Sequence, residues 1–346
     1  MTLEIAAALT DRDVEVAIEV AEGETVALLG PNGAGKSSVL GLAAGTLRPD
    51  RGRVVLDGRE LASERRFVPP HDRRVALLAQ DPLLFPHLSV LDNVAFGPRS
   101  RGRGHRAARE AAAHWLGEVD AADLADRRPA SLSGGQAQRV AVARALAADP
   151  RVLLLDEPMA ALDVAVAPAL RQTLRRVLAE RTALLVTHDV LDALLLADRV
   201  VVLEAGRVVE DGPSAEVLSR PRSPFAARIA GLNMVSGTWD DGAVLDADGV
   251  AIRGLAAEVG PGPGERVVAV FRPSAVSVFR EAPGGSPRNS LAVTITDLEP
   301  HGDQVRVRAG HLAADVTLPS VAELDLAPGV RVVFAVKASE VSVYPI

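Results

Sequence analysis

The chain contains 346 residues, of which 48 % are hydrophobic and 24 % are charged, and its formal net charge is −7. This length favours two or three domains. The acidic balance argues against a nucleic-acid-binding chain, and the lack of any cysteine excludes disulfides and thiolate metal sites.

The start of the chain and its apolar runs predict a protein that is soluble by itself. The first residues include Glu4 and no basic region followed by an apolar core, so we expect no signal peptide. No apolar run reaches the roughly 18–20 residues that cross a bilayer. We therefore expect any membrane contact to pass through a partner.

The first two-thirds of the chain alternate between predicted strands and helices. Residues 14–20 alternate apolar and polar side chains, which is typical of a half-buried strand. Continuous apolar runs, typical of strands buried on both faces, follow at 25–30, 151–156 and 183–189. Segments rich in alanine and leucine, which predict helices, lie at 105–117, 136–148 and 165–180. This alternation predicts an α/β domain.

The character of the chain changes after a basic, proline-containing stretch at 219–233, which we interpret as a domain boundary. Short valine-rich segments then alternate with Gly/Pro turns and predict an all-β, OB-like domain over 232–346. Residues 263–279 and 328–344 are identical at nine of 17 positions without a gap. We therefore predict two related β-barrel halves, with Asn233 and Asn289 opening the two copies.

Residues 30–38, GPNGAGKSS, fit the phosphate-loop pattern G-x-x-x-x-G-K-[ST] directly after a predicted strand. The glycines allow backbone amides to curl around a phosphate, and Lys36 is expected to reach the β- and γ-phosphates. Ser37 is expected to ligate Mg²⁺. The predicted ATP-binding residues are Gly30, Pro31, Asn32, Gly33, Ala34, Gly35, Lys36, Ser37 and Ser38.

A second part of the same site follows the buried strand at 151–156. Asp156 ends this strand, where it is expected to hold magnesium through water. Glu157 lies next to it and is placed to polarise the attacking water. These two carboxylates and the phosphate loop predict a nucleoside-triphosphate hydrolase.

Residues 131–146, SLSGGQAQRVAVARAL, lie directly upstream of the DEP segment and resemble the signature of ATP-binding-cassette (ABC) ATPases. The phosphate loop, Gln80, Asp163 in ALD and His188 in THD match this family in order and spacing. The resemblance implies an α/β P-loop ATPase domain over 1–225, with a helical subdomain at about 81–145.

In that family two cassettes meet head to tail, so the resemblance implies a homodimer in which each signature covers the other copy's γ-phosphate. The hydroxyl and amides at a helix start suit such an anion. The implied trans contacts are Ser133, Gly134, Gly135, Gln136 and Asp163, of which Asp163 bridges the subunits. The implied catalytic residues are Glu157, Gln80 and His188, and the magnesium ligands are Ser37, Gln80 and Asp156.

One departure from the family concerns the adenine base, which is usually stacked on an aromatic residue about twenty residues before the phosphate loop. The corresponding stretch, 8–16, contains no aromatic residue. Arg12 either stacks its guanidinium plane on the base or is a solvated loop arginine.

Residues 81–97 resemble the groove in which importing cassettes receive a coupling helix from a membrane permease. The leucines and phenylalanine there either form an apolar patch around this groove or belong to the helical core: Leu83, Leu84, Phe85 and Leu88. The basic run 99–109 is either a solvated face or a surface that favours anionic headgroups.

An alternative is a soluble cassette protein that acts on ribosomes or DNA. Such proteins usually carry two cassettes, long coiled-coil insertions or cysteine-rich zinc modules, none of which this sequence shows. We therefore favour an importer subunit on the cytoplasmic face of the membrane, with a permease and, indirectly, an extracytoplasmic solute-binding protein as partners.

The phrase SPRN at 286–289, together with KAS at 337–339, resembles the oligomeric-β (Mop/TOBE) module of molybdate importer ATPases. The resemblance implies molybdate or tungstate as the solute and as a regulatory ligand. Importers of sulfate, ferric ion, polyamines and sugars carry related modules and remain alternatives. The residues that suit a tetrahedral dianion are Ser286, Arg288, Asn289, Lys337 and Ser339. Lys337 is one of only two lysines; alternatively, it is a solvated strand-edge residue.

Overall fold

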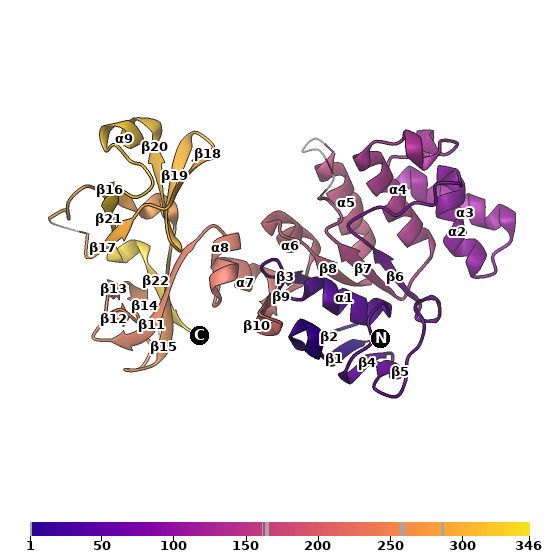
Figure 1. Cartoon of the computed structure of the whole chain (residues 1–346), viewed down its shortest axis with the longest axis horizontal. Coiled ribbons are helices and arrows are strands. Elements are labelled where there is room, and N and C mark those ends of the chain that lie inside the picture. The colour runs from indigo at the N-terminus through magenta and orange to yellow at the C-terminus, as the bar shows by residue number, and fades with distance from the viewer. Residues whose placement is uncertain (1, 161, 163–165, 257–259, 285–286) are drawn as a thin grey trace. The chain divides into compact units, whose positions relative to one another are not determined.

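The computed structural model describes residues 2–160, 162, 166–256, 260–284 and 287–346 (Figure 1). They form two compact units, residues 1–217 and 218–346. Within the described residues, no helix is both long enough and apolar enough to span a membrane.

The centre of the first unit is a six-stranded sheet of order β10-β9-β3-β8-β7-β6. All of its strands are parallel except the edge strand β10. Their bounds are β3 Thr25–Leu29, β6 Val75–Leu78, β7 Val152–Asp156, β8 Thr182–Val186, β9 Arg199–Glu204 and β10 Arg207–Pro213. Strands β3, β7 and β8 confirm the prediction from continuous apolar runs, which suit strands that are covered on both faces.

A second, antiparallel sheet of order β2-β1-β4-β5 packs with the first around helix α1 (Figure 1). Its strands are β1 Leu3–Leu9, β2 Val14–Val20, β4 Arg51–Leu56 and β5 Arg59–Ser63. Helix α1, Lys36–Ala44, is almost entirely buried between the two sheets. The helix that follows the phosphate loop is therefore fixed by packing against both sheets.

The other helices of this unit cover the sheet's opposite face and build a separate core. They are α2 Val90–Ser100, α3 His105–Glu118, α4 Gly134–Ala147, α5 Ala167–Leu178 and α6 Val190–Leu196. Helix α7, Ser214–Ser219, leads into the second unit. Single 3₁₀ turns are η1 Thr10–Arg12, η2 Pro70–Asp72, η3 Ala122–Leu124 and η4 Pro129–Ser131.

Arg73 is the largest fully buried side chain of the chain's described part, and no carboxylate within that part pairs with it. Its guanidinium donates instead to the carbonyls of Val68 and Leu42 at 2.7 Å, and to Ala43 and Leu61 at 3.2 and 3.4 Å. Two of these carbonyls belong to the last turn of α1, where intrahelical donors are lacking and a cation suits the helix dipole. Arg73 therefore fixes the end of the phosphate-loop helix.

We predict that Arg73→Met lowers the free energy of unfolding of the first unit by about 3 kcal/mol or more, because several buried carbonyls lose their donor. Urea titration followed by Trp115 fluorescence measures this in a Trp239→Phe background, where Trp115 is the remaining tryptophan. Arg65→Met, at an exposed position, is the matched control and is expected to change stability by less than about 0.5 kcal/mol. Equal midpoints for the two variants would contradict the capping role.

The second unit is built from strands, as predicted, with two short helices, α8 Pro224–Ile229 and α9 Leu318–Glu323. The first half holds β11 Asn233–Asp240, β12 Ala243–Leu245, β13 Ala251–Arg253, β14 Leu255–Ala256, β15 Arg266–Phe271, η5 Pro273–Ala275 and β16 Ser277–Phe279. The second half holds β17 Asn289–Thr294, β18 Asp297–His301, β19 Gln304–Ala309, β20 Leu312–Thr317, β21 Arg331–Val336, η6 Ala338–Glu340 and β22 Ser342–Pro345.

The two copies of the sequence repeat exchange their last strands. Strand β15 pairs with β22 with Ala269 opposite Val343, and β21 pairs with β16 with Phe334 opposite Val278. Both pairs are related by the same 65-residue offset as the sequence repeat. The final strand of each copy therefore completes the sheet of the other.

Asn233 and Asn289 open β11 and β17 and are both only 1 % exposed. The Asn233 amide exchanges two hydrogen bonds with the backbone of Ala313, at 2.7 and 2.8 Å. The Asn289 amide does the same with Arg253, at 2.7 and 2.9 Å. These bonds correct the expected role of Asn289. Its side chain is hydrogen-bonded to the backbone of the other copy, so we do not assign it to an oxyanion site.

Candidate active site

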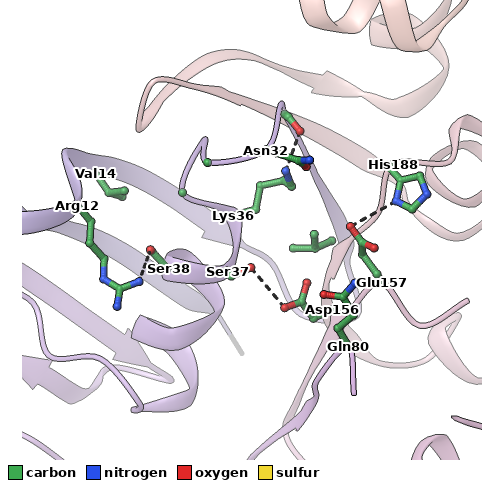
Figure 2. A pocket seen from close by; sticks show the side chains of 14 residues that line it. Arg12, Val14, Asn32, Lys36, Ser37, Ser38, Gln80, Asp156, Glu157 and His188 are labelled. Atoms are coloured by element: carbon green, nitrogen blue, oxygen red, sulfur yellow. Dashed lines mark hydrogen bonds and ion pairs between the residues drawn. The ribbon is translucent and has the colours of Figure 1, made fainter. Parts of the chain in front are cut away.

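A pocket of about 850 Å³ lies at the carboxyl ends of strands β3, β7 and β8 (Figure 2). Parallel strands direct their carboxyl ends to one edge of a sheet, where ligands of open α/β folds bind. The structure therefore brings together residues that are far apart in the sequence. The pocket is lined by Arg12, Val14, Gly30, Asn32, Gly33, Gly35, Lys36, Ser37, Ser38, Gln80, Asp156, Glu157, Val186 and His188.

The phosphate loop has the backbone that its glycines predict. Gly33 and Gly35 have φ angles of 80° and 99°, in the left-handed region, and a Cβ on Gly35 would lie 2.7 Å from the Val14 side chain. Lys36 begins α1, and its Nζ donates to the carbonyls of Gly30 and Pro31 at 2.7 and 2.9 Å. Burial lowers the pKa of Lys36, opposed by Glu157 and Asp156. This ammonium and the helix start provide an anion site.

Asp156 ends β7 opposite the loop and accepts a hydrogen bond from Ser37 Oγ at 3.4 Å. Burial raises the pKa of Asp156, as does Glu157, while Ser37 and Lys36 oppose the shift. Gln80 follows β6 and lies beside Asp156 in Figure 2. A hydroxyl, a carboxylate and an amide oxygen are hard donors of the kind that hold Mg²⁺ together with substrate phosphates, so these residues fit that ion.

Glu157 and His188 form the far side of the pocket, with Glu157 Oε1 3.3 Å from His188 Nδ1 (Figure 2). Glu157 has a φ of 48°, which is uncommon for a residue with a side chain, and its N–H donates to Val186 O at 2.9 Å. Strained backbone of this kind concentrates at functional sites. The strain fixes the Glu157 carboxylate at the mouth of the pocket.

The residues on both sides of His188, Thr187 and Asp189, belong to a hydrogen-bonded network that the sequence did not indicate. Thr187 Oγ1 donates to Asp192 Oδ2 at 3.3 Å, and Arg171 Nε donates to Asp192 Oδ1 at 2.7 Å. Burial raises the pKa of Asp192, opposed mainly by its hydrogen bond from Arg171. Because Arg171 lies on α5 and Asp192 on α6, the network joins these helices behind the histidine. No local pattern could have revealed a pairing that only the fold creates.

Arg12 lies at the opposite end of the pocket from His188 and donates to Ser38 Oγ at 3.4 Å. Arg12 is the last residue of the 3₁₀ turn η1, which precedes β2, and this turn sets its position. This end of the pocket is where the predicted adenine contact falls, and stacking by Arg12 stays a prediction.

The signature residues Ser133, Gly134, Gly135 and Gln136 do not line this pocket. Ser133 caps α4: its hydroxyl accepts from Gln136 N at 3.3 Å, and the Gln136 side chain accepts from Ser133 N at 3.0 Å. Ser133 and Gly134 are exposed at the positive end of this 14-residue helix. Asp163 lies outside the described residues. The signature helix start therefore lies outside the nucleotide pocket of its own chain.

Gln138 connects the signature helix to the hydrolytic site, a contact that the sequence did not indicate. Its buried side chain donates from Nε2 to the carbonyl of Pro158 at 3.1 Å, one residue after Glu157. This hydrogen bond joins α4 to the backbone beside Glu157.

In the second unit, the strand register brings two of the predicted oxyanion residues, Arg288 and Lys337, close together. Asn289 lies opposite Val336, so Arg288 and Lys337 flank this pair at the same end of adjacent strands. Lys337 and Ser339 are both exposed. Ser286 lies outside the described residues.

The corresponding place in the first copy is a pocket of about 970 Å³ that includes Arg272 and Ser274, the counterparts of Lys337 and Ser339. By the offset between the two opening asparagines, Leu232 stands where the second copy has Arg288. The first copy therefore lacks one of the two cations of the second.

The comparisons with known proteins agree with this geometry. Residues 14–160 match the family described as ABC transporter, and residues 285–343 match the TOBE domain. The molybdenum import ATP-binding protein ModC of Mycobacterium tuberculosis is 51 % identical, over 99 % of this chain and 97 % of its own length. A sulfate/thiosulfate import ATP-binding protein of Chromobacterium violaceum is 40 % identical, over 94 % of this chain and 92 % of its own length.

A solved structure, a dimeric post-hydrolysis state of an ATP-binding cassette bound to ADP and Pi, aligns with a TM-score of 0.56 and 28 % identity. The alignment covers 62 % of this chain and 99 % of that one. The fold and the site define a P-loop ATPase. The chain belongs to the ATP-binding proteins of the ABC transporter family and carries a C-terminal TOBE domain.

Proposed function

We propose that this chain is the ATP-hydrolysing subunit of an importer for molybdate or tungstate, acting at the cytoplasmic face of the membrane. The observation that carries the proposal is the 51 % identity to a molybdenum import protein, which extends over both units. The sulfate/thiosulfate relative, at 40 % identity, supports sulfate as the second candidate.

The working form in this proposal is a homodimer. The pocket supplies Lys36, Asp156 and Glu157 but no contact from the exposed Ser133–Gly134 helix start of the same chain. A second copy, placed head to tail, supplies this helix start to the γ-phosphate and encloses the nucleotide. The dimeric solved cassette, which is bound to ADP and Pi, supports the arrangement.

Hydrolysis follows from the placement of Glu157. Its carboxylate accepts a proton from water as the water oxygen bonds to the γ-phosphorus and the bond to the β–γ bridging oxygen breaks, releasing ADP and phosphate. Lys36 and His188 are placed to stabilise the charge on the γ-phosphate oxygens. Ser37, Asp156 and Gln80 would hold Mg²⁺, which neutralises charge on the β- and γ-phosphates when bound.

We assign the contact with the permease to an apolar patch in the helical subdomain. Leu83 is 68 % exposed and Phe96 is 48 % exposed, and the rings of Phe85 and Phe96 lie 4.7 Å apart. Arg144 donates to the carbonyls of Pro82 and Leu83 at 2.8 and 2.7 Å and so holds the loop in place.

The expected patch is thereby revised. Leu84 packs against the helical core, Leu88 is half-buried, and Phe96 joins the patch. Because the loop begins directly after Gln80, a permease helix seated here would move a group that faces the nucleotide. An apolar groove of this kind is suited to an amphipathic partner helix.

The proposal is tested by metal uptake in a host strain from which this gene is deleted. We expect molybdenum accumulation from low external molybdate to fall and to be restored by the wild-type gene but not by Glu157→Gln. Uptake of sulfate is expected to be unchanged. If deletion instead abolishes sulfate uptake and leaves molybdenum unchanged, the second candidate is correct.

We further expect the second unit to bind molybdate through Arg288, Lys337 and Ser339. Lys337→Ala should weaken binding roughly ten- to a hundredfold, because a charge-assisted hydrogen bond contributes about 1.5–3 kcal/mol. Calorimetry of the full chain measures this in a Lys36→Ala background, which weakens oxyanion binding to the phosphate loop. Arg272→Ala, at the equivalent position of the first copy, is the matched control. Equal affinities in both variants would leave Lys337 as a solvated strand-edge residue.

A further inference from the structure

The first unit has a second polar pocket, of about 520 Å³, at the other end of the central sheet. Arg74 directly precedes β6 and Arg151 directly precedes β7, whereas Gln80 and Asp156 of the nucleotide site follow or end these same strands. The ATPase chemistry described above uses none of the residues at the amino ends.

Four arginines line this pocket: Arg74, Arg101, Arg103 and Arg151. The only carboxylate among the described lining residues is that of Asp149. That carboxylate also pairs with an arginine outside the pocket, because Arg181 Nη1 lies 3.7 Å from Asp149 Oδ1. Arg151 also interacts with Glu22, which does not line the pocket. The positive charge concentrated in this concave place is therefore mainly that of Arg74, Arg101 and Arg103, in a chain with a net charge of −7.

Helix ends account for only part of this charge. Helices α2 and α4 both end beside the pocket, and cations suit the carbonyls at helix C-termini. Arg101 Nη1 fulfils this role by donating to the carbonyl of Asp149 at 2.6 Å. The side chains of Arg74 and Arg103 make no hydrogen bond or ion pair with the described part of the protein. Their charges therefore remain available to a ligand.

The arginines also destabilise one another. Burial lowers the pKa of Arg101, and the neighbouring charges of Arg74 and Arg103 act in the same direction, against Asp149. Like charges held this close are relieved by a multivalent anion. The planar guanidinium fork matches phosphate oxygens in pairs, which makes arginine the preferred cation for this group.

We propose that the pocket formed by Arg74, Arg101, Arg103 and Arg151 binds a phosphate-bearing anion, either a free phosphate compound or a lipid headgroup. The site is separate from the nucleotide pocket and independent of the solute that is imported. An anion held there ties the ends of α2 and α4 to the starts of β6 and β7. The signature residue Ser133 caps the start of α4, so the ligand would bias the orientation of that helix.

The test compares two double variants that remove the same charge from exposed positions. Arg74→Gln/Arg103→Gln changes the pocket, and Arg65→Gln/Arg106→Gln changes arginines that do not line it. Calorimetry with inorganic pyrophosphate is carried out on the full chain in a Lys36→Ala background, so that the phosphate loop contributes little. We expect the pocket variant to bind about tenfold or more weakly and the control to bind like the parent.

The source of the phosphate is decided by flotation with phosphatidylcholine vesicles that contain or lack phosphatidylglycerol. If the parent protein floats with the anionic vesicles and the pocket variant does not, the ligand is a lipid headgroup. If the protein binds pyrophosphate but does not float with the vesicles, the ligand is a free phosphate compound. ATP hydrolysis, measured with Lys36 intact, is expected to be unchanged in both double variants. Arg103→Gln alone is the second variant if the double variant does not fold. Equal binding by pocket and control variants, or no binding of either probe at millimolar concentration, overturns the proposal.

Discussion

Glu157→Gln is expected to lower kcat for ATP hydrolysis by about 10²–10⁴-fold, the usual contribution of a positioned general base, while ATP affinity changes little. Glutamine has the same shape and leaves the backbone bond from residue 157 to Val186 O intact, but it cannot accept the proton of the attacking water. Phosphate release under steady-state conditions measures the loss.

The same variant is expected to accumulate as a dimer with ATP, because the closed state forms and cannot be hydrolysed. Gel filtration with saturating ATP and Mg²⁺ measures this. Glu180→Gln, at an exposed position at the end of α5, is the matched control and should behave like the wild type. A Glu157→Gln protein that hydrolyses ATP at the normal rate, or stays monomeric with saturating ATP, would show that the carboxylate has another role.

Ser133→Arg is expected to reduce turnover by about 10²-fold or more and to leave ATP affinity almost unchanged. Ser133 does not line the pocket of its own chain, and in the proposed dimer it acts on the nucleotide of the second copy. Nucleotide binding and phosphate release are measured on the same preparation.

Ser133 also caps α4, so the variant must be separated from a loss of stability. Ser133→Asp retains a good N-cap but places a negative charge where the phosphate of the second copy is expected. It should fold normally and still fail to turn over. Activity retained by Ser133→Asp and lost by Ser133→Arg would indicate that only the size of the side chain matters.

Local patterns were sufficient for three strands of the central sheet and for the phosphate loop. The apolar runs that became β3, β7 and β8 are covered on both faces, and this burial imposes their composition. Parallel strands place their carboxyl ends together, and the phosphate loop, Asp156 and His188 follow or end such strands. The structure confirms that they share a pocket.

The sequence could not distinguish Arg73 from Arg74. The first is buried on the carbonyls of α1, and the second is exposed beside the second pocket. Neighbouring identical residues carry no local signal of such a difference, which arises from the packing of a distant helix. The same is true of Arg171 and Asp192, whose pairing joins two helices.

In the second unit the sequence revealed the repeat but not the exchange of strands. Similar strands pair equally well within a copy or between copies, so only the folded register shows that β16 completes the sheet of the second copy. Resemblance to a binding motif placed Asn289 among anion ligands, whereas its buried amide fastens the backbone of Arg253.

We expect ATP to be hydrolysed between the phosphate loop of one copy and the signature of another. The most direct test mixes Ser133→Arg with Lys36→Ala, each nearly inactive alone, and measures phosphate release. If the two variants mix freely, half of the dimers are heterodimers, and each heterodimer has one intact site of two. The rate of phosphate release should therefore recover to at most about one quarter of the wild-type rate. Ser133→Arg protein that hydrolyses ATP at the wild-type rate without any partner would contradict the claim.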